Sequence, residues 1–196
     1  MLFGGGMVMK KILSICFATY VFILLIVNFT FAEDVYYARC NLKVIKGDNI
    51  SWVNWQSTPT FIPAGTKLKV NKAGDTASLV RMDTGASYKL DIGADGDMFL
   101  EKFVSKKPIS IDKFSPEVQA NIRKAIAKIG MTKEEVYIAM GPPTNIDNAR
   151  TNDKTFENIM HSDSWVYARR RFGKNIGVAF DPNTGRVNRT EGIWGD

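Results

Sequence analysis

The sequence predicts an α+β protein that begins with an export signal and continues through a small β barrel into a domain of two helices and a three-stranded antiparallel sheet. Three observations lead to this prediction: a charged and then apolar N-terminus, short strand patterns up to residue 110, and a helix, helix, strand, strand, strand order after it. The predicted boundaries are residues 1–32, 33–110 and 111–196.

Residues 1–32 have the pattern of a secretory signal peptide, which predicts export to the periplasm or cell envelope. Lys10 and Lys11 precede an apolar run, and Thr30-Phe31-Ala32 places small residues at positions −3 and −1 of a cleavage before Glu33. The apolar run is about 20 residues long, which is enough to span a bilayer. An uncleaved membrane anchor is therefore the alternative.

The composition argues against a nucleic-acid-binding role. The chain carries 26 Lys and Arg against 20 Asp and Glu, and loss of the signal removes two lysines, so 24 basic against 20 acidic residues leave a net charge of +4. Cys16 leaves with the signal and Cys40 remains alone, so no intramolecular disulfide can form. Lipidation of Cys16 is not expected, because Ile15 stands where lipoprotein signals have a small residue.

Six strand patterns, separated by turns rich in Gly, Asn and Asp, fill residues 33–110. We expect strands at 35–45, 51–55, 61–70, 78–82, 87–92 and 99–104. Six short strands in about 70 residues are typical of a small, strongly bent barrel of SH3-like type. Pro108 stops any regular structure at the join to the next domain.

The first predicted helix starts at Ser115 and Pro116, with serine as N-cap and proline at the first helical position. Apolar residues then recur at helical spacing and predict a helix that ends at Gly130. They are Val118, Ile122, Ala125, Ile126 and Ile129.

The segment GMTKEEVYIAMGPP, residues 130–143, predicts a second, short helix with both ends marked. Thr132 and Glu135 have the spacing of a capping box, and Met131 and Val136 stand at the positions of a hydrophobic staple. Gly141 is expected to end the helix in the left-handed conformation. So short a helix needs tertiary packing to be stable.

Three strands at 164–172, 175–181 and 186–190 follow, joined by short turns. They predict an antiparallel meander whose apolar face the two helices cover. The stretch from Asn145 to Asp163 is polar and predicts a long mobile loop.

The segments GMTKEEVYIAMGPP, DSWVY and VAFDPNTGRV together resemble the SmpA/OmlA family, whose best-known member is the small lipoprotein of the outer-membrane β-barrel assembly machinery. The preceding half, with FIPAGT at residues 61–66, is similar to the SH3-like partner of this module in uncharacterised bacterial envelope proteins. Membership implies a helix-helix-sheet fold, a non-enzymatic role and an envelope location. It assigns no lipid-binding or assembly contacts to particular residues, because this chain lacks the lipidation cysteine and carries an extra β domain.

The candidate partner-binding site is a stripe on the first strand of the meander, made of Trp165, Tyr167, Arg169 and Arg171. Residues two apart share one face of a strand, so these rings and guanidinium groups would lie together, and Arg186 or Arg189 could add charge. Such a stripe suits phosphate or carboxylate groups of an envelope polymer, of lipid heads or of an acidic protein patch. The alternative is a solvated outer face on which arginine stems cover the rings.

Cys40 and His161 define an enzymatic alternative, a periplasmic hydrolase with a cysteine nucleophile. The pattern around Cys40 puts it on the apolar face of a strand, which favours a buried structural cysteine. His161 lies in a polar stretch without a second His or Cys at metal-ligand spacing, so no metal and no cofactor are expected there.

Two other patterns suggest ligands less strongly. Asp91, Asp95 and Asp97 are spaced like calcium ligands, but glycine and lysine stand where further acids are needed, so a charged turn is expected. Trp52 and Trp55 could line a ligand groove, but their odd spacing predicts that at least one is in the core.

We therefore expect an exported, non-catalytic binding or scaffolding protein of the cell envelope. Its partner would be an envelope protein or an anionic envelope polymer, with no nucleic acid and with the membrane as a further candidate surface. A third hypothesis is an enzyme-inhibitor-like protein, from the similarity of the helix-sheet unit to secreted β-lactamase-inhibitor proteins that bind an enzyme through an exposed sheet.

Overall fold

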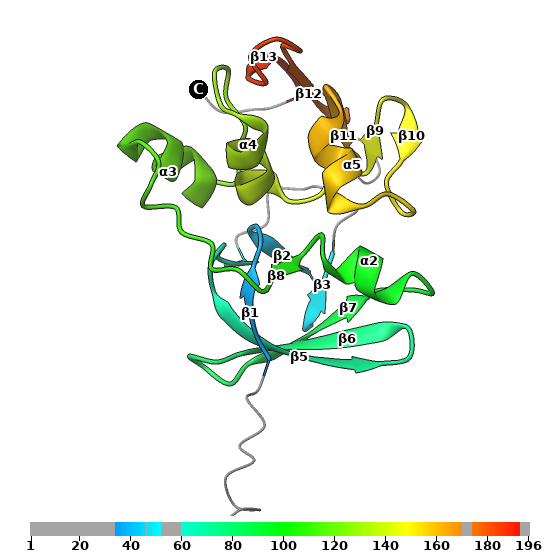
Figure 1. Cartoon of the computed structure of the whole chain (residues 1–196). Helices are drawn as coiled ribbons and strands as arrows, with labels where there is room; N and C mark the ends of the chain where they lie inside the picture. The colour runs from blue at the N-terminus through cyan, green and yellow to red at the C-terminus, as the bar shows by residue number, and fades with distance from the viewer. Residues whose placement is uncertain (1–33, 46, 52–59, 170–173, 193–196) are drawn as a thin grey trace, which may run out of the picture. The chain divides into compact units, whose positions relative to one another are not determined.

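The computed structural model describes residues 34–45, 47–51, 60–169 and 174–192, and residues 34–196 form one compact unit. The fold is α+β and consists mainly of sheet, with a curled eight-stranded sheet in the N-terminal half and a five-stranded sheet in the C-terminal half (Figure 1). The predicted signal peptide lies outside the described residues.

The first sheet has the strand order β4-β2-β3-β7-β6-β5-β1-β8, in which only the β3–β7 pair is parallel. Its strands are β1 (Val35–Ala38), β2 (Leu42–Ile45), β3 (Asn49–Ile50), β4 (Phe61–Ile62), β5 (Lys67–Ala73), β6 (Thr76–Arg81), β7 (Ser87–Asp91) and β8 (Val104–Ser105). Leu68, Leu79 and Leu90 are almost fully buried in its interior.

Three of the predicted strands are wrong in extent. The strand expected at 61–70 is interrupted at residues 63–66, between β4 and β5. The strand expected at 35–45 breaks between β1 and β2, because the Asn41 N–H turns away from the sheet and donates to Ile138 O at 2.9 Å. The strand expected at 99–104 is mostly not strand: helix α2 spans Gly96–Leu100, residues 101–103 form a turn, and β8 starts only at Val104. Phe99 and Phe103 explain the helical turn, since their ring centroids lie 5.3 Å apart, whereas a strand would separate residues four apart by about 13 Å.

Helix α3 (Pro116–Arg123) starts as predicted, and Ser115 Oγ accepts the Val118 N–H at 3.3 Å. Its predicted end at Gly130 is wrong. Ala125 has a φ of 56°, a left-handed conformation that a helix cannot continue through. Ile129 is consequently 72 % exposed and does not extend the apolar stripe.

Helix α4 (Lys133–Met140) has the predicted capping box. Thr132 Oγ1 accepts the Glu135 N–H at 3.3 Å, and Glu135 Oε2 accepts the Thr132 N–H at 2.7 Å. Val136 to Met140 are all buried, so most of the helix surface is packed, as its shortness requires. Gly141 ends it with φ 78° and ψ −165°, which is not the expected αL conformation but another that is nearly restricted to glycine.

The second sheet contains the predicted antiparallel meander and two further strands, in the order β10-β9-β11-β12-β13. Its strands are β9 (Asn145–Ile146), β10 (Ala149–Arg150), β11 (Ser164–Tyr167), β12 (Ile176–Phe180) and β13 (Val187–Glu191). Helices α4 and α5 (Phe156–His161) lie on one face of this sheet (Figure 1).

The expected long loop between Asn145 and Asp163 is wrong. Asp147 and Asn148 have φ values of 45° and 67°, the two positive angles of a type I′ turn, and they close the β9–β10 hairpin. Thr155 and Asn158 then cap α5 reciprocally, with Thr155 Oγ1 accepting the Asn158 N–H at 3.1 Å. Both signals are present in the sequence, but each consists of only two polar residues.

Candidate functional site

The expected exposed stripe of aromatic residues and arginines does not exist, because its two rings belong to the core. Trp165 is 0 % and Tyr167 is 1 % exposed. The Trp165 ring meets Tyr137 of α4 and Phe180 of β12 edge to face, with centroids 6.0 and 4.7 Å away. The face of β11 that carries these rings thus points at the helices.

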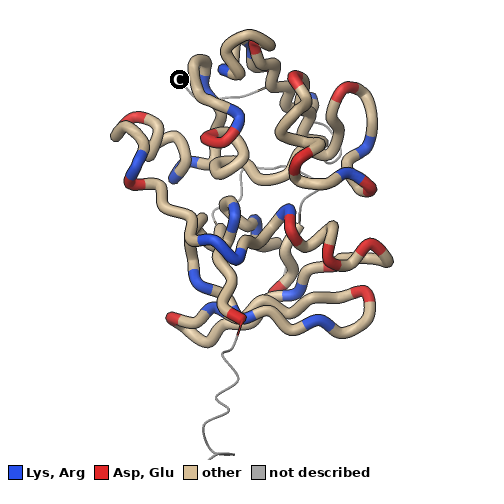
Figure 2. The backbone as a smooth tube through the Cα atoms, viewed as in Figure 1, with Lys and Arg blue, Asp and Glu red and all other residues tan. Residues whose placement is uncertain are grey.

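The arginines of the predicted stripe do not continue that face. Strand β11 ends at Tyr167, so the alternation that put Arg169 beside the rings stops before it, and Arg169 is half-buried with its backbone N–H on Asn175 Oδ1. Arg171, like Trp52 and Trp55, lies outside the described residues. Arg186 and Arg189 are exposed, and Arg189 pairs with Glu191. Figure 2 shows basic and acidic residues interspersed along both halves in this view.

Cys40 is buried, as its pattern predicted. Burial raises the pKa of its thiol from 9.0 to about 12, although the charge of Arg39 opposes the rise. A cysteine nucleophile needs the opposite, a lowered pKa in a partly exposed site. His161 is exposed at the end of α5, with Nδ1 2.8 Å from Glu157 O. No recorded contact in the described part of the chain joins the two side chains.

The aspartates of residues 91–97, which have a spacing like that of calcium ligands, form hydrogen bonds and an ion pair within the fold. Asp91 Oδ1 accepts the Gly93 N–H, Asp97 pairs with Lys72, and α2 begins directly after Asp95. Within the described ranges, no three His, Cys, Asp or Glu side chains are grouped to hold a metal ion. The same ranges contain no helix with the length and apolar character needed to cross a bilayer.

An open apolar groove of about 390 Å³ lies between the two halves. Four segments line it: the β1–β2 bend, the segment between β8 and α3, helix α4 and helix α5. The lining residues are Arg39, Ile109, Glu134, Tyr137, Ile138, Phe156 and Met160. A side chain at Gly65 would collide with the carbonyl oxygen of Ile109, so glycine lets the chain pass close to this wall of the groove.

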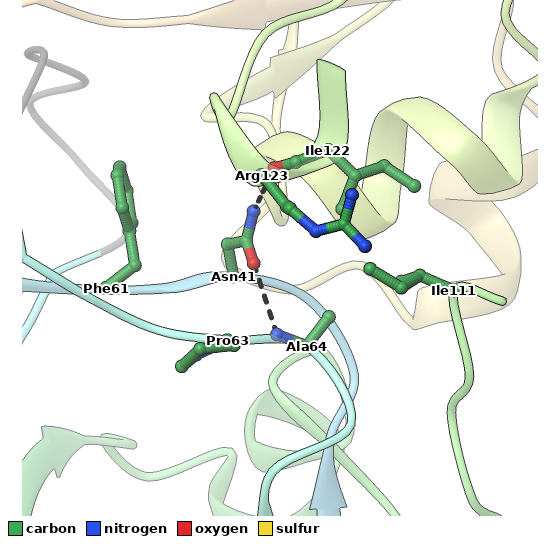
Figure 3. Close-up of a pocket in the computed structure, with 7 residues that line it drawn as sticks. All are labelled: Asn41, Phe61, Pro63, Ala64, Ile111, Ile122 and Arg123. Carbon is green, nitrogen blue, oxygen red and sulfur yellow. Dashed lines mark hydrogen bonds between the residues drawn. The ribbon is translucent and has the colours of Figure 1, made fainter. Parts of the chain in front are cut away.

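A smaller hollow of about 120 Å³, the junction pocket, lies where the first sheet meets α3 (Figure 3). Asn41 at its base is fully engaged: its Nδ2 donates to Ile122 O at 2.6 Å and Ala139 O at 3.1 Å, and its Oδ1 accepts the Ala64 N–H at 3.1 Å. The amide therefore joins the sheet to α3 and α4, and its polar atoms are occupied by the fold.

A third hollow, of about 500 Å³, is a polar cleft against the first sheet. Lys89, Asp91 and Asp95 contribute charges of both signs, Ile50 and Phe99 form apolar wall, and Asn152 closes it from the C-terminal half. Its mixed lining favours no single ligand chemistry.

A buried lysine holds the neighbouring turn in place. Lys102 is 1 % exposed and its Nζ donates to Thr151 O at 2.6 Å and Asn152 O at 2.8 Å. Burial lowers the pKa of Lys102 to about 8, against opposing charges on Asp95, Asp153 and Glu101, and burial also lowers the pKa of Lys43 to about 8.

The lowered pKa values of Lys102 and Lys43 predict that the free energy of unfolding rises between pH 8 and 9. The unfolded chain keeps both lysines protonated there while the folded chain releases protons, so each contributes on the order of 1 kcal/mol per pH unit. Urea unfolding at pH 7.5, 8, 8.5 and 9 measures the slope. We expect Lys102→Met to lower it by about half, whereas Lys107→Met, which removes an exposed cation, leaves it unchanged. Equal slopes in the two variants would contradict the role of burial. Cys40 opposes the trend increasingly as the pH approaches 9, because its thiol has a pKa near 9.0 when unfolded and about 12 when buried, but it does so equally in both variants.

Sequence reasoning missed Arg39 and Phe156, which line the groove, and Asn41 and Lys102, which connect the two halves. Each acts through a partner more than 30 residues away in the sequence, so no local pattern marks it. Comparison of the chain with protein-family models, with curated proteins and with solved structures found no match.

Proposed function

We propose that this protein is exported to the cell envelope and acts there as a non-catalytic binding module that holds a segment of a partner in the apolar groove. The observation that carries the proposal is the groove itself, because apolar side chains from three separate segments form an open surface next to a cation from a fourth. The signal-peptide pattern of residues 1–32 supports export.

We also infer a two-module organisation, an SH3-like barrel followed by an SmpA/OmlA-like domain. The sequence motifs between residues 130 and 190 support the second module, and so does the antiparallel meander β11-β12-β13, although a hairpin and helix α5 stand between it and helices α3 and α4. The curl of the first sheet and its short strands support the first.

The binding role is tested by site-specific photo-crosslinking in the cell envelope. A benzoylphenylalanine at position 160, in the groove, should capture a partner, whereas the same group at position 82, which is exposed outside the groove, should not. Met160→Glu should reduce capture by a crosslinker at position 109 about tenfold, because it places a charge in an apolar contact. Met82→Glu is the matched control. Equal capture from positions 160 and 82 would contradict the assignment of the groove.

Export is tested separately by mass spectrometry of the protein purified from the envelope. An N-terminus at Glu33 is expected, and a chain that retains residues 1–32 would instead identify an anchor.

A further inference from the structure

The groove contains one cation in a fixed position. Arg39 is half-buried in the bend between β1 and β2, where its Nε donates to Glu101 O at 2.6 Å and its Cζ lies 4.1 Å from the centroid of the Phe156 ring. Stacking and one hydrogen bond orient the planar guanidinium. Among the described residues, only Nε of its donor groups has a recorded partner, so the terminal N–H groups are available to a ligand.

Arg39 forms no ion pair with a carboxylate of the described residues. Glu134, on the rim, already pairs with Lys113 at 2.7 Å, and the Glu101 carboxylate keeps its charge but is directed at the Phe156 N–H, from which it accepts a hydrogen bond at 3.0 Å. The neighbouring walls are Ile109, Ile138 and Met160, which cannot solvate a charge.

This arrangement selects a carboxylate with apolar neighbours. A guanidinium binds a carboxylate through two parallel hydrogen bonds, and such a pair is stronger beside apolar walls than in water. The groove is open along one side, which suits a protein segment whose outer face stays in water. A lipid tail needs a more enclosed cavity, because most of its surface must be buried.

We propose that the groove binds a segment of a partner protein in which an Asp or Glu side chain, flanked by apolar residues, pairs with Arg39 while its neighbours pack on Ile109, Ile138 and Met160. This inference rests on the proposed function and adds the chemistry of the partner. Arg39 is the specificity-determining residue, and the apolar walls supply binding that does not distinguish charge.

The test measures binding of acetylated, amidated nonapeptides to the protein purified from the envelope. The peptides have Glu or Gln at the centre and Leu, Ile, Val or Phe on either side. We expect the best Glu peptide to bind about tenfold more tightly than its Gln counterpart, because only the carboxylate forms the paired hydrogen bonds. Arg39→Gln should bring this ratio to about one while leaving the affinity for the Gln peptide within about twofold. Arg39→Lys, which keeps the charge without the planar fork, should give an intermediate ratio.

The outcomes separate the two proposals. If wild type binds Glu and Gln peptides equally and Met160→Glu weakens both, the groove binds protein segments but the role of Arg39 is wrong. If Met160→Glu and Arg39→Gln both leave binding of every peptide unchanged, the proposed function fails. The inference would also be overturned if a Gln peptide with a free C-terminal carboxylate bound more tightly than the amidated Glu peptide. Binding of dodecanoate in place of the peptides would overturn it as well. Circular dichroism of each variant confirms that it is folded.

Discussion

Trp165→Ala is expected to lower the free energy of unfolding by about 4 kcal/mol, a value near the upper end of the range for a single substitution in a protein core. The indole is fully buried between Tyr137 and Phe180, and its Nε1 donates to Ile159 O at 3.0 Å. Alanine would leave a cavity at the contact between α4, α5 and the second sheet. It would also deprive a buried carbonyl of a donor, since among the described residues only the Ser162 N–H also donates to Ile159 O.

Urea unfolding monitored by circular dichroism measures the effect. Trp165→Phe should cost about half as much, because it keeps part of the ring packing and loses the N–H. Ile129→Ala is the matched control, since it truncates a large apolar side chain that is 72 % exposed, and it should change stability by less than about 0.5 kcal/mol. A loss below about 1 kcal/mol for Trp165→Ala would be incompatible with a buried indole and would reopen the exposed-stripe hypothesis.

The second large effect is expected for Asn41→Leu, which keeps the approximate size of the side chain and removes its amide. We expect a loss of about 3 kcal/mol, because the Ala64 N–H and Ala139 O lose their partner at a buried junction. Ile122 O is affected less, since it also accepts the Ala125 N–H at 2.9 Å. The variant therefore weakens the connection between the first sheet and helices α3 and α4.

The same unfolding measurement tests Asn41→Leu, with Asn188→Leu as the control on an exposed position of β13. Amide hydrogen exchange provides a local readout. The Ala64 N–H, now bonded to Asn41 Oδ1, should lose its protection in the variant, while the Val136 N–H, inside α4, should change only as far as global stability does. Retained protection at Ala64 would show that the amide is not what joins the sheet to the helices.

The parts of the fold that were predicted correctly depend on contacts between near neighbours in the sequence. The capping box of α4 joins residues three apart, and the turns of the meander join strands that follow each other directly. Errors arose where a distant partner changes the local outcome. The predicted strand from 35 to 45 breaks because Asn41 bonds to α3 and α4, a separation of 81 or more residues.

The partner-binding stripe illustrates the same limit. Alternation along β11 correctly placed Trp165 and Tyr167 on one face of the strand. Alternation alone does not show which face meets the helices, because it does not depend on where the covering helices lie. The arginines that follow suggested an outward face, yet β11 ends before the first of them.

The sequence alone determined the α+β class, the helix starts at Ser115 and Thr132 and the antiparallel meander, because each depends on backbone preferences and short-range hydrogen bonds. Only the tertiary structure decided that Trp165 is core and that Arg39 lies over Phe156 in an apolar groove. The physical reason is that burial and the partners of a charge are set by packing between remote segments, and these contacts leave no periodic trace in the chain.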